Sequence, residues 1–153
     1  MEFWNSSVGA VVLGAVPLAV FAVFWFGIIS HLVRKSGLRT LQADYPLQGK
    51  VGRDFKRLRV RSGRMGQVRF NGMLRLDLNP HFLVVRFKRP FAFVFSGVQI
   101  PLSEVRYEGV RGKWIFKYHH FTLSGHSIDI YGKAEPLIRR LEAQPSTPIT
   151  GQE

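Results

Sequence analysis

One long uncharged segment near the N-terminus constrains this chain more than any other feature. Residues Val8 to Val33 include no Asp, Glu, Lys or Arg. A helix rises about 1.5 Å per residue, so the stretch from Val8 to Ser30 spans about 35 Å and crosses a hydrocarbon core of about 30 Å with some tilt. The sequence therefore predicts a transmembrane helix over residues 8–33, preceded by a short extracytoplasmic N-terminus over residues 1–7.

A cleavable signal peptide and a buried helix of a soluble protein are the alternatives. A signal peptide begins with basic residues, has a shorter apolar stretch and ends in small residues at the cleavage site. Here Glu2 is the only charged side chain in residues 1–7, and the apolar segment ends in the bulky residues Phe24, Trp25 and Phe26. These features favour a retained membrane helix.

Charged and small residues predict the orientation and the contacts of this helix. The N-terminal side has no Lys or Arg, so the positive-inside rule places the N-terminus outside and the following domain in the cytoplasm. The basic residues that set this topology are Arg34, Lys35 and Arg39. Small residues at a spacing of four permit close approach of a second helix, and the candidates are Ala10, Gly14, Ala15 and Ala19.

Residues 34–49 are predicted to be a juxtamembrane helix and linker. Ser36 provides a candidate cap and Pro46 ends the helical pattern. Leu38, Leu41 and Tyr45 share one helical face. This stripe either packs on the following domain or lies on the inner leaflet, and packing on the domain is favoured because the stripe is short.

Residues 50–143 are predicted to be mainly β. Apolar and polar residues alternate in segments separated by Gly, Pro, Asn and Ser, a pattern typical of antiparallel strands with one buried face. The alternating segments begin near Leu58, Leu74, Leu83, Phe91, Val98, Trp114 and Ile128. About seven short strands of this kind form a small barrel or sandwich.

The core and the end of the domain follow from the same pattern. Leu76, Val85, Phe93 and Phe116 are expected in the core. After Gly132 the period becomes helical, which predicts a C-terminal helix with one apolar face made of Ala134, Leu137, Ile138 and Leu141. Residues 144–153 form a polar tail.

Two short segments resemble those of small bacterial single-pass membrane proteins with a pleckstrin-homology (PH)-like or GRAM-like domain. One is Ser36-Gly37-Leu38-Arg39-Thr40-Leu41 leading to Tyr45-Pro46, and the other is Ile100-Pro101-Leu102-Ser103-Glu104-Val105. The resemblance covers the layout of about residues 36 to 142. It implies a seven-stranded PH-like domain capped by a C-terminal helix, at the cytoplasmic face of the bacterial inner membrane. Fold alone assigns no activity.

The sequence offers little for catalysis or metal binding. There is no Cys, and His119 and His120 point to opposite faces of a strand, so they do not share a metal. Glu104, Glu108 and Asp129 are interpreted as charge partners of basic neighbours rather than as an acid–base pair. No Gly-x-Ser-x-Gly motif is present. We therefore expect a protein that is not an enzyme and has no metal or cofactor.

Positive charge is concentrated just after the predicted membrane helix. The net charge is +12, and residues 34–75 alone carry 12 Lys or Arg against two Asp. Arg57, Arg59 and Arg61 are expected on one strand face. The candidate lipid- or partner-binding residues of this basic face are Lys50, Arg53, Lys56, Arg57, Arg59, Arg61 and Arg64.

The sequence leaves three functions open. The leading one is a non-enzymatic accessory protein that binds anionic lipid head groups or an acidic protein surface, as a subunit of a membrane complex. The charge also fits a topology signal with a protected sheet edge. A membrane-tethered regulator that binds nucleic acid or nucleotide is the alternative, although most aromatic residues alternate as core residues rather than as a stacking surface. The third is a membrane-bound enzyme.

Overall fold

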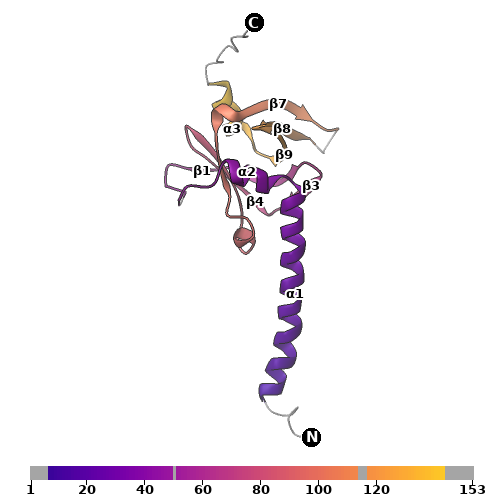
Figure 1. Ribbon diagram of the computed structural model, residues 1–153. Coiled ribbons are helices and arrows are strands. Elements are labelled where there is room, and N and C mark those ends of the chain that lie inside the picture. The colour runs from indigo at the N-terminus through magenta and orange to yellow at the C-terminus, as the bar shows by residue number, and fades with distance from the viewer. Residues whose placement is uncertain (1–6, 50, 114–116, 144–153) are drawn as a thin grey trace.

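The computed structural model describes residues 7–49, 51–113 and 117–143. A long helix, α1 (Ser7–Lys35), leaves one side of a β domain as a single rod. The C-terminal helix α3 (Glu135–Glu142) lies on the side of the domain away from α1 (Figure 1). The chain therefore consists of an N-terminal apolar helix, an antiparallel β domain and a closing helix, as the sequence predicts at this level.

α1 is long and apolar enough to cross a membrane. Its apolar part, Leu13–Lys35, reaches a mean hydropathy of 2.2, and the helix continues through Pro17. Only its last turns enter the domain, where Ile29 and Val33 are fully buried. The C-terminal end of α1 is therefore part of the folded core.

A two-residue turn joins α1 to α2 (Leu38–Asp44). Ser36 lies in this turn, where its Oγ donates to the carbonyl of Val33 at 2.9 Å and accepts from the N–H of Leu38 at 3.4 Å. Gly37 has a φ of 80°, a conformation that costs glycine little. Leu38 and Leu41 are fully buried, which confirms that the apolar stripe packs on the domain.

Two antiparallel sheets form the domain. The four-stranded sheet has the order β1-β4-β5-β6, with bounds Lys56–Arg57, Leu74–Leu78, Phe82–Phe87 and Val98–Pro101. The five-stranded sheet has the order β3-β2-β9-β8-β7, with bounds Val68–Asn71, Val60–Met65, His126–Gly132, Tyr118–Leu123 and Val105–Arg111. The 3₁₀ turns η2 (Phe91–Phe93) and η3 (Leu102–Glu104) lie on either side of β6.

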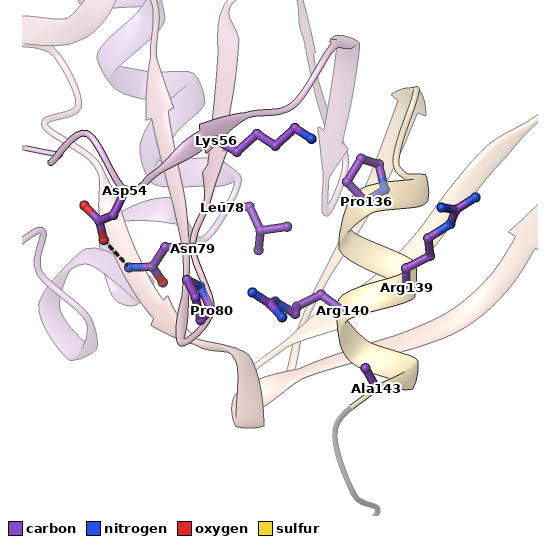
Figure 2. Close-up of a pocket in the computed structure, with 9 residues that line it drawn as sticks. All are labelled: Asp54, Lys56, Leu78, Asn79, Pro80, Pro136, Arg139, Arg140 and Ala143. Atoms are coloured by element: carbon purple, nitrogen blue, oxygen red, sulfur yellow. Dashed lines mark hydrogen bonds between the residues drawn. The ribbon is translucent and has the colours of Figure 1, made fainter.

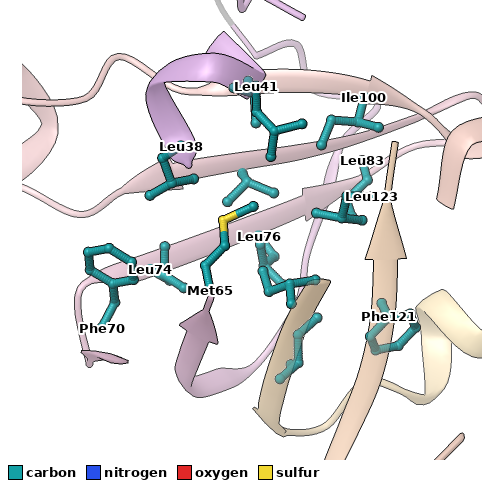
Figure 3. Packing of buried hydrophobic residues seen from close by; sticks show 14 of the residues in the cluster. Leu38, Leu41, Met65, Phe70, Leu74, Leu76, Leu83, Ile100, Phe121 and Leu123 are labelled. Carbon is teal, nitrogen blue, oxygen red and sulfur yellow. The ribbon is translucent and has the colours of Figure 1, made fainter. Parts of the chain in front are cut away.

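The core fills the space between the sheets and under α2. Figure 3 shows Leu38 and Leu41 of α2 pointing into the same cluster as Met65 and Leu76. Leu76 and Val85 are fully buried, as predicted. The apolar face of α3 is likewise confirmed, since Ala134 and Leu137 are buried and Ile138 and Leu141 pack against the core.

The segment 91–95 differs from the prediction. It forms the turn η2 rather than a strand, and Phe93 is 65% exposed instead of lying in the core. Pro90 has no N–H and so ends the hydrogen-bond ladder of β5. The N–H groups of Phe91 and Val94 then donate to Lys88 and Phe91, which closes a turn. Phe116, the other aromatic predicted for the core, lies outside the described residues.

The described part of the chain has nine strands rather than about seven. The sequence pattern joins β1 and β2 into one segment, and it does not single out β3 and β7, where only two large apolar residues alternate in each strand (Val68 and Phe70, Val105 and Tyr107). The chain also changes sheets within 58–59, where the N–H of Leu58 donates to Leu76 of β4 and the carbonyl of Arg59 accepts from Lys133 after β9. For this reason Arg57, Arg59 and Arg61 do not share one strand face.

Candidate functional site

The structure separates the predicted basic residues into several places. Lys50 lies outside the described residues, and Arg53 is exposed in the loop before β1. Arg57 belongs to the four-stranded sheet, whereas Arg61 and Arg64 belong to β2 of the five-stranded sheet. The basic face predicted from the sequence is therefore divided between the two sheets.

The outer face of the four-stranded sheet gathers the denser group of cations. Strand register places Arg57 opposite Asp77, and Arg75 opposite Arg86. Because side chains alternate along a strand, these four residues share one face. We call the hollow at this face the arginine pocket; it has a volume of about 600 Å³, and its cations are Arg57, Arg75, Arg86, Lys88 and Arg89.

One buried carboxylate organises this pocket. Asp77 is 1% exposed and accepts from Arg75 Nε at 3.0 Å and from Arg86 Nε at 2.8 Å. Two arginines directly opposite each other on neighbouring strands repel, and the shared carboxylate offsets this repulsion. Among the described residues, Asp77 is the acidic group paired with the pocket, so five cations face one carboxylate. The pocket is therefore suited to bind an anion.

The loop after β5 forms the remaining wall of the arginine pocket. Ala92 and Ser96 line it, and Ser96 Oγ accepts from Gln42 Nε2 of α2 at 2.5 Å. The tip of the same loop contacts α1, where the rings of Phe93 and Phe26 pack edge-to-face with centroids 4.3 Å apart. The loop that forms this wall of the pocket therefore also contacts the apolar helix.

A second basic hollow lies on the five-stranded sheet. It has a volume of about 550 Å³, and its cations are Arg59, Arg61, Arg69, Lys117 and Lys133. The guanidinium of Arg69 lies over the Tyr131 ring, 4.7 Å from its centroid, a cation–π contact. Arg59 also lines a smaller hollow that continues to Arg57, so the two basic surfaces adjoin.

A third hollow lies between β4 and α3, and Figure 2 shows its residues. It has a volume of about 420 Å³ and carries Lys56, Arg139 and Arg140. Asn79 shapes its rim, donating to Asp54 at 3.1 Å and accepting from the N–H of Phe82. Lys56 thus faces α3 rather than the arginine pocket.

Arg64 belongs to a polar row across the five-stranded sheet. Asp129 lies between Arg64 and His120 in the strand register, and its two oxygens accept from Arg64 Nε at 2.7 Å and contact His120 Nδ1 at 2.5 Å. The hydrogen bond from Arg64 to Asp129 raises the pKa of Arg64, so this guanidinium stays charged. Asp129 is therefore the charge partner that the sequence predicts.

Glu108 and His119 complete this region. Glu108 Oε2 lies 3.4 Å from His120 Nε2, and a hydrogen bond from Thr122 lowers the pKa of Glu108. His119 points to the other face and contacts the Tyr107 hydroxyl at 3.2 Å. Both nitrogens of His120 thus face carboxylates. In the ranges described, no three His, Asp or Glu side chains form a metal-binding group.

The small residues of α1 fall on two faces. By helical geometry Ala15 and Ala19 share the face of Phe26, whereas Gly14 lies about 120° away. A Cβ atom at Gly14 would meet nothing within 4 Å, so this face is open to a neighbour. The side chain of Ala10 is outside the described part of the helix. The predicted helix–helix contact stays a prediction.

Sequence reasoning did not single out Arg75, Arg86, Lys88 and Arg89. The alternation in β4 already places Arg75 and Asp77 on the outer face. That Arg86 shares the same carboxylate depends on the β4–β5 register, which the sequence does not specify.

A comparison with protein-family models found no match, and comparisons with curated proteins and with solved structures found no significant similarity.

Proposed function

We propose that this chain is a non-enzymatic single-pass membrane protein whose β domain binds anionic lipid head groups through the arginine pocket. The observation that carries the proposal is the contact between Phe93 and Phe26, which brings a wall of the pocket against the apolar helix. If α1 crosses the bilayer, the pocket lies at the level where lipid phosphates are found.

The charge of the pocket supports this ligand. Arginine binds phosphate through several N–H donors, and Asp77 holds two of the arginines in place before a ligand arrives. Each Lys or Arg near an anionic membrane surface contributes about 1 kcal/mol of attraction. An acidic protein surface within a membrane complex is the competing ligand for the same cations.

The proposal includes a fold and a location. The two antiparallel sheets and the closing helix α3 support a PH-like domain. Arg34 and Lys35, in the last turn of α1, support a cytoplasmic domain and an outside N-terminus. The proposed location is the bacterial inner membrane.

Lipid titration of the full-length protein tests the head-group proposal. In neutral detergent, a short-chain phosphatidylglycerol is added to wild type and to the triple variant Arg57→Gln/Lys88→Gln/Arg89→Gln. This variant keeps Arg75 and Arg86, because their removal would leave Asp77 buried without a partner. Losing three cations at about 1 kcal/mol each weakens binding by about 3 kcal/mol, more than a hundredfold. Phosphatidylcholine of the same chain length is the uncharged reference ligand.

A matched control removes the same charge elsewhere. The variant Arg106→Gln/Arg111→Gln/Lys113→Gln changes exposed cations at and after β7, outside the arginine pocket. It should bind phosphatidylglycerol nearly as well as wild type. Equal weakening of both triples would mean that net charge, not the pocket, attracts the lipid. If wild type does not bind phosphatidylglycerol, the head-group proposal is wrong. The competing ligand, an acidic protein surface, is then sought among proteins that co-purify with wild type but not with the pocket triple.

A further inference from the structure

We propose that the turn η2 inserts into the bilayer beside α1 and forms a second membrane contact of the chain, with the acyl chains of one leaflet as its partner. The inference rests on the proposed crossing of the bilayer by α1, and it does not depend on head-group binding. Its structural basis is the position, exposure and flanking charges of Phe93.

Phe93 is an apolar side chain left open at the tip of a loop. It is 65% exposed, more than any other large apolar side chain described outside α1. Its neighbour Phe95 is buried in the core, so the loop is anchored while Phe93 projects from it. One edge of the Phe93 ring packs on Phe26, and the rest of the ring faces outward. The free part of the ring lacks an apolar partner within the described chain.

The contact with Phe26 gives the depth of the turn. Phe26 precedes Arg34 by about 12 Å along the helix axis. The interfacial layer on each side of a bilayer is only about 5–8 Å thick. With Arg34 among the head groups, Phe93 therefore reaches the hydrocarbon. The half-burial of Ala22 and Phe26 on the same helix face agrees with a loop that descends along α1.

The charges around the turn match a leaflet rather than a protein groove. Lys88 and Arg89 directly precede the turn and line the arginine pocket on the sheet, whereas Phe93 contacts Phe26 of α1. Interfacial membrane anchors combine apolar side chains that enter the hydrocarbon with cations that stay at the level of the head groups. The neighbouring α1 surface is itself apolar and exposed at Val23, which extends the apolar surface beside the turn.

Spin-label accessibility tests the insertion, since the chain has no native cysteine. Three single variants of the full-length protein carry a nitroxide: Phe93→Cys at the turn, Leu18→Cys within α1 and Val110→Cys on β7. All three positions are exposed, so labelling disturbs no core contact. The proteins are reconstituted in phosphatidylcholine bilayers, which removes electrostatic attraction. Collision rates with oxygen, which is enriched in the hydrocarbon, and with a water-soluble nickel chelate report depth.

We expect the oxygen-to-nickel ratio at position 93 to be several-fold higher than at position 110 and closer to that at position 18. A nickel accessibility at position 93 equal to that at position 110, with position 18 shielded, would refute insertion and leave the membrane anchor intact. A water-accessible label at position 18 would overturn both the anchor and the insertion. Head-group binding is read separately, in the lipid titration of the pocket variants.

Discussion

Phe93 and Phe95 show how far the environments of two nearby residues can diverge. They would lie on the same face of a strand, yet one is 65% and the other 1% exposed. The turn η2 breaks the alternation of two, since Pro90 ends the ladder of β5 and the chain then turns at Phe91. Phe95 packs on Phe87 with ring centroids 5.1 Å apart, as part of the core.

Alanine at these two positions should have very different effects on stability. Phe95→Ala should lower the free energy of unfolding by about 3–5 kcal/mol, the usual range for truncating a core aromatic residue. Phe93→Ala should change it by less than about 0.5 kcal/mol in detergent, because an exposed site loses little packing. Denaturant unfolding followed by circular dichroism measures both. Similar losses for the two variants would mean that Phe93 is also held by the domain.

At the scale of elements, the domain depends on the point where the chain leaves the four-stranded sheet after β1 and enters the five-stranded sheet at β2. β2 pairs with β9 through a register shift between Val60 and Ser62, and Gly132 lies opposite this shift. Gly132 has a φ of 128°, and a Cβ atom there would lie 2.9 Å from the carbonyl oxygen of Arg59. The backbone approaches this closely only because residue 132 has no side chain.

Gly132→Ala should therefore destabilise the domain by about 1–3 kcal/mol or more, from the unfavourable φ and the backbone contact together. The measurement is again the free energy of unfolding of the full chain. Gly72→Asn is the matched control: Gly72 has a φ of 67°, where Asn is tolerated, and a Cβ atom would meet nothing within 4 Å. If Gly72→Asn lowers the free energy of unfolding as much as Gly132→Ala does, the close backbone contact at Gly132 is not the cause of the loss.

Most elements with a strong pattern were predictable, and the exceptions have physical causes. The apolar residues of β4 and β6 alternate clearly, and the helical stripes of α2 and α3 pack as their spacing indicates. β7 follows no such pattern because its sheet face is largely exposed. The arginine pocket depends on the register of β1 and β5 against β4, which the sequence does not specify, so its cations were recognisable only as charges.

At the scale of the whole molecule, the end of α1 is built into the domain. Val33 and Leu38 are both fully buried on either side of the two-residue turn. A fragment that begins at residue 50 would lack these core side chains along with Leu41, so the domain is best studied with its helix. If α1 crosses a membrane as proposed, the β domain lies on the side of the membrane where α1 ends.

Topology reporters test this arrangement in cells. A green fluorescent protein fused after Glu153 should fluoresce, and alkaline phosphatase fused at the same place should be inactive. The expected cause is the cluster of Arg34, Lys35 and Arg39 after a segment with no Lys or Arg before it. Active phosphatase with a dark fluorescent fusion would reverse the proposed orientation and place the arginine pocket outside the cytoplasm.

Only two residues, Ser36 and Gly37, separate α1 from α2, so if α1 crosses a membrane as proposed, the domain moves with the tilt of α1. Membrane helices adapt to a thinner hydrocarbon layer by tilting, and their tilts in known structures average about 20°. The turn η2 lies to one side of α1, where Phe93 contacts Phe26, so a change in the tilt of α1 raises or lowers the turn in the bilayer. In the proposed membrane-spanning arrangement, the domain converts the tilt of α1 into a change of depth at Phe93.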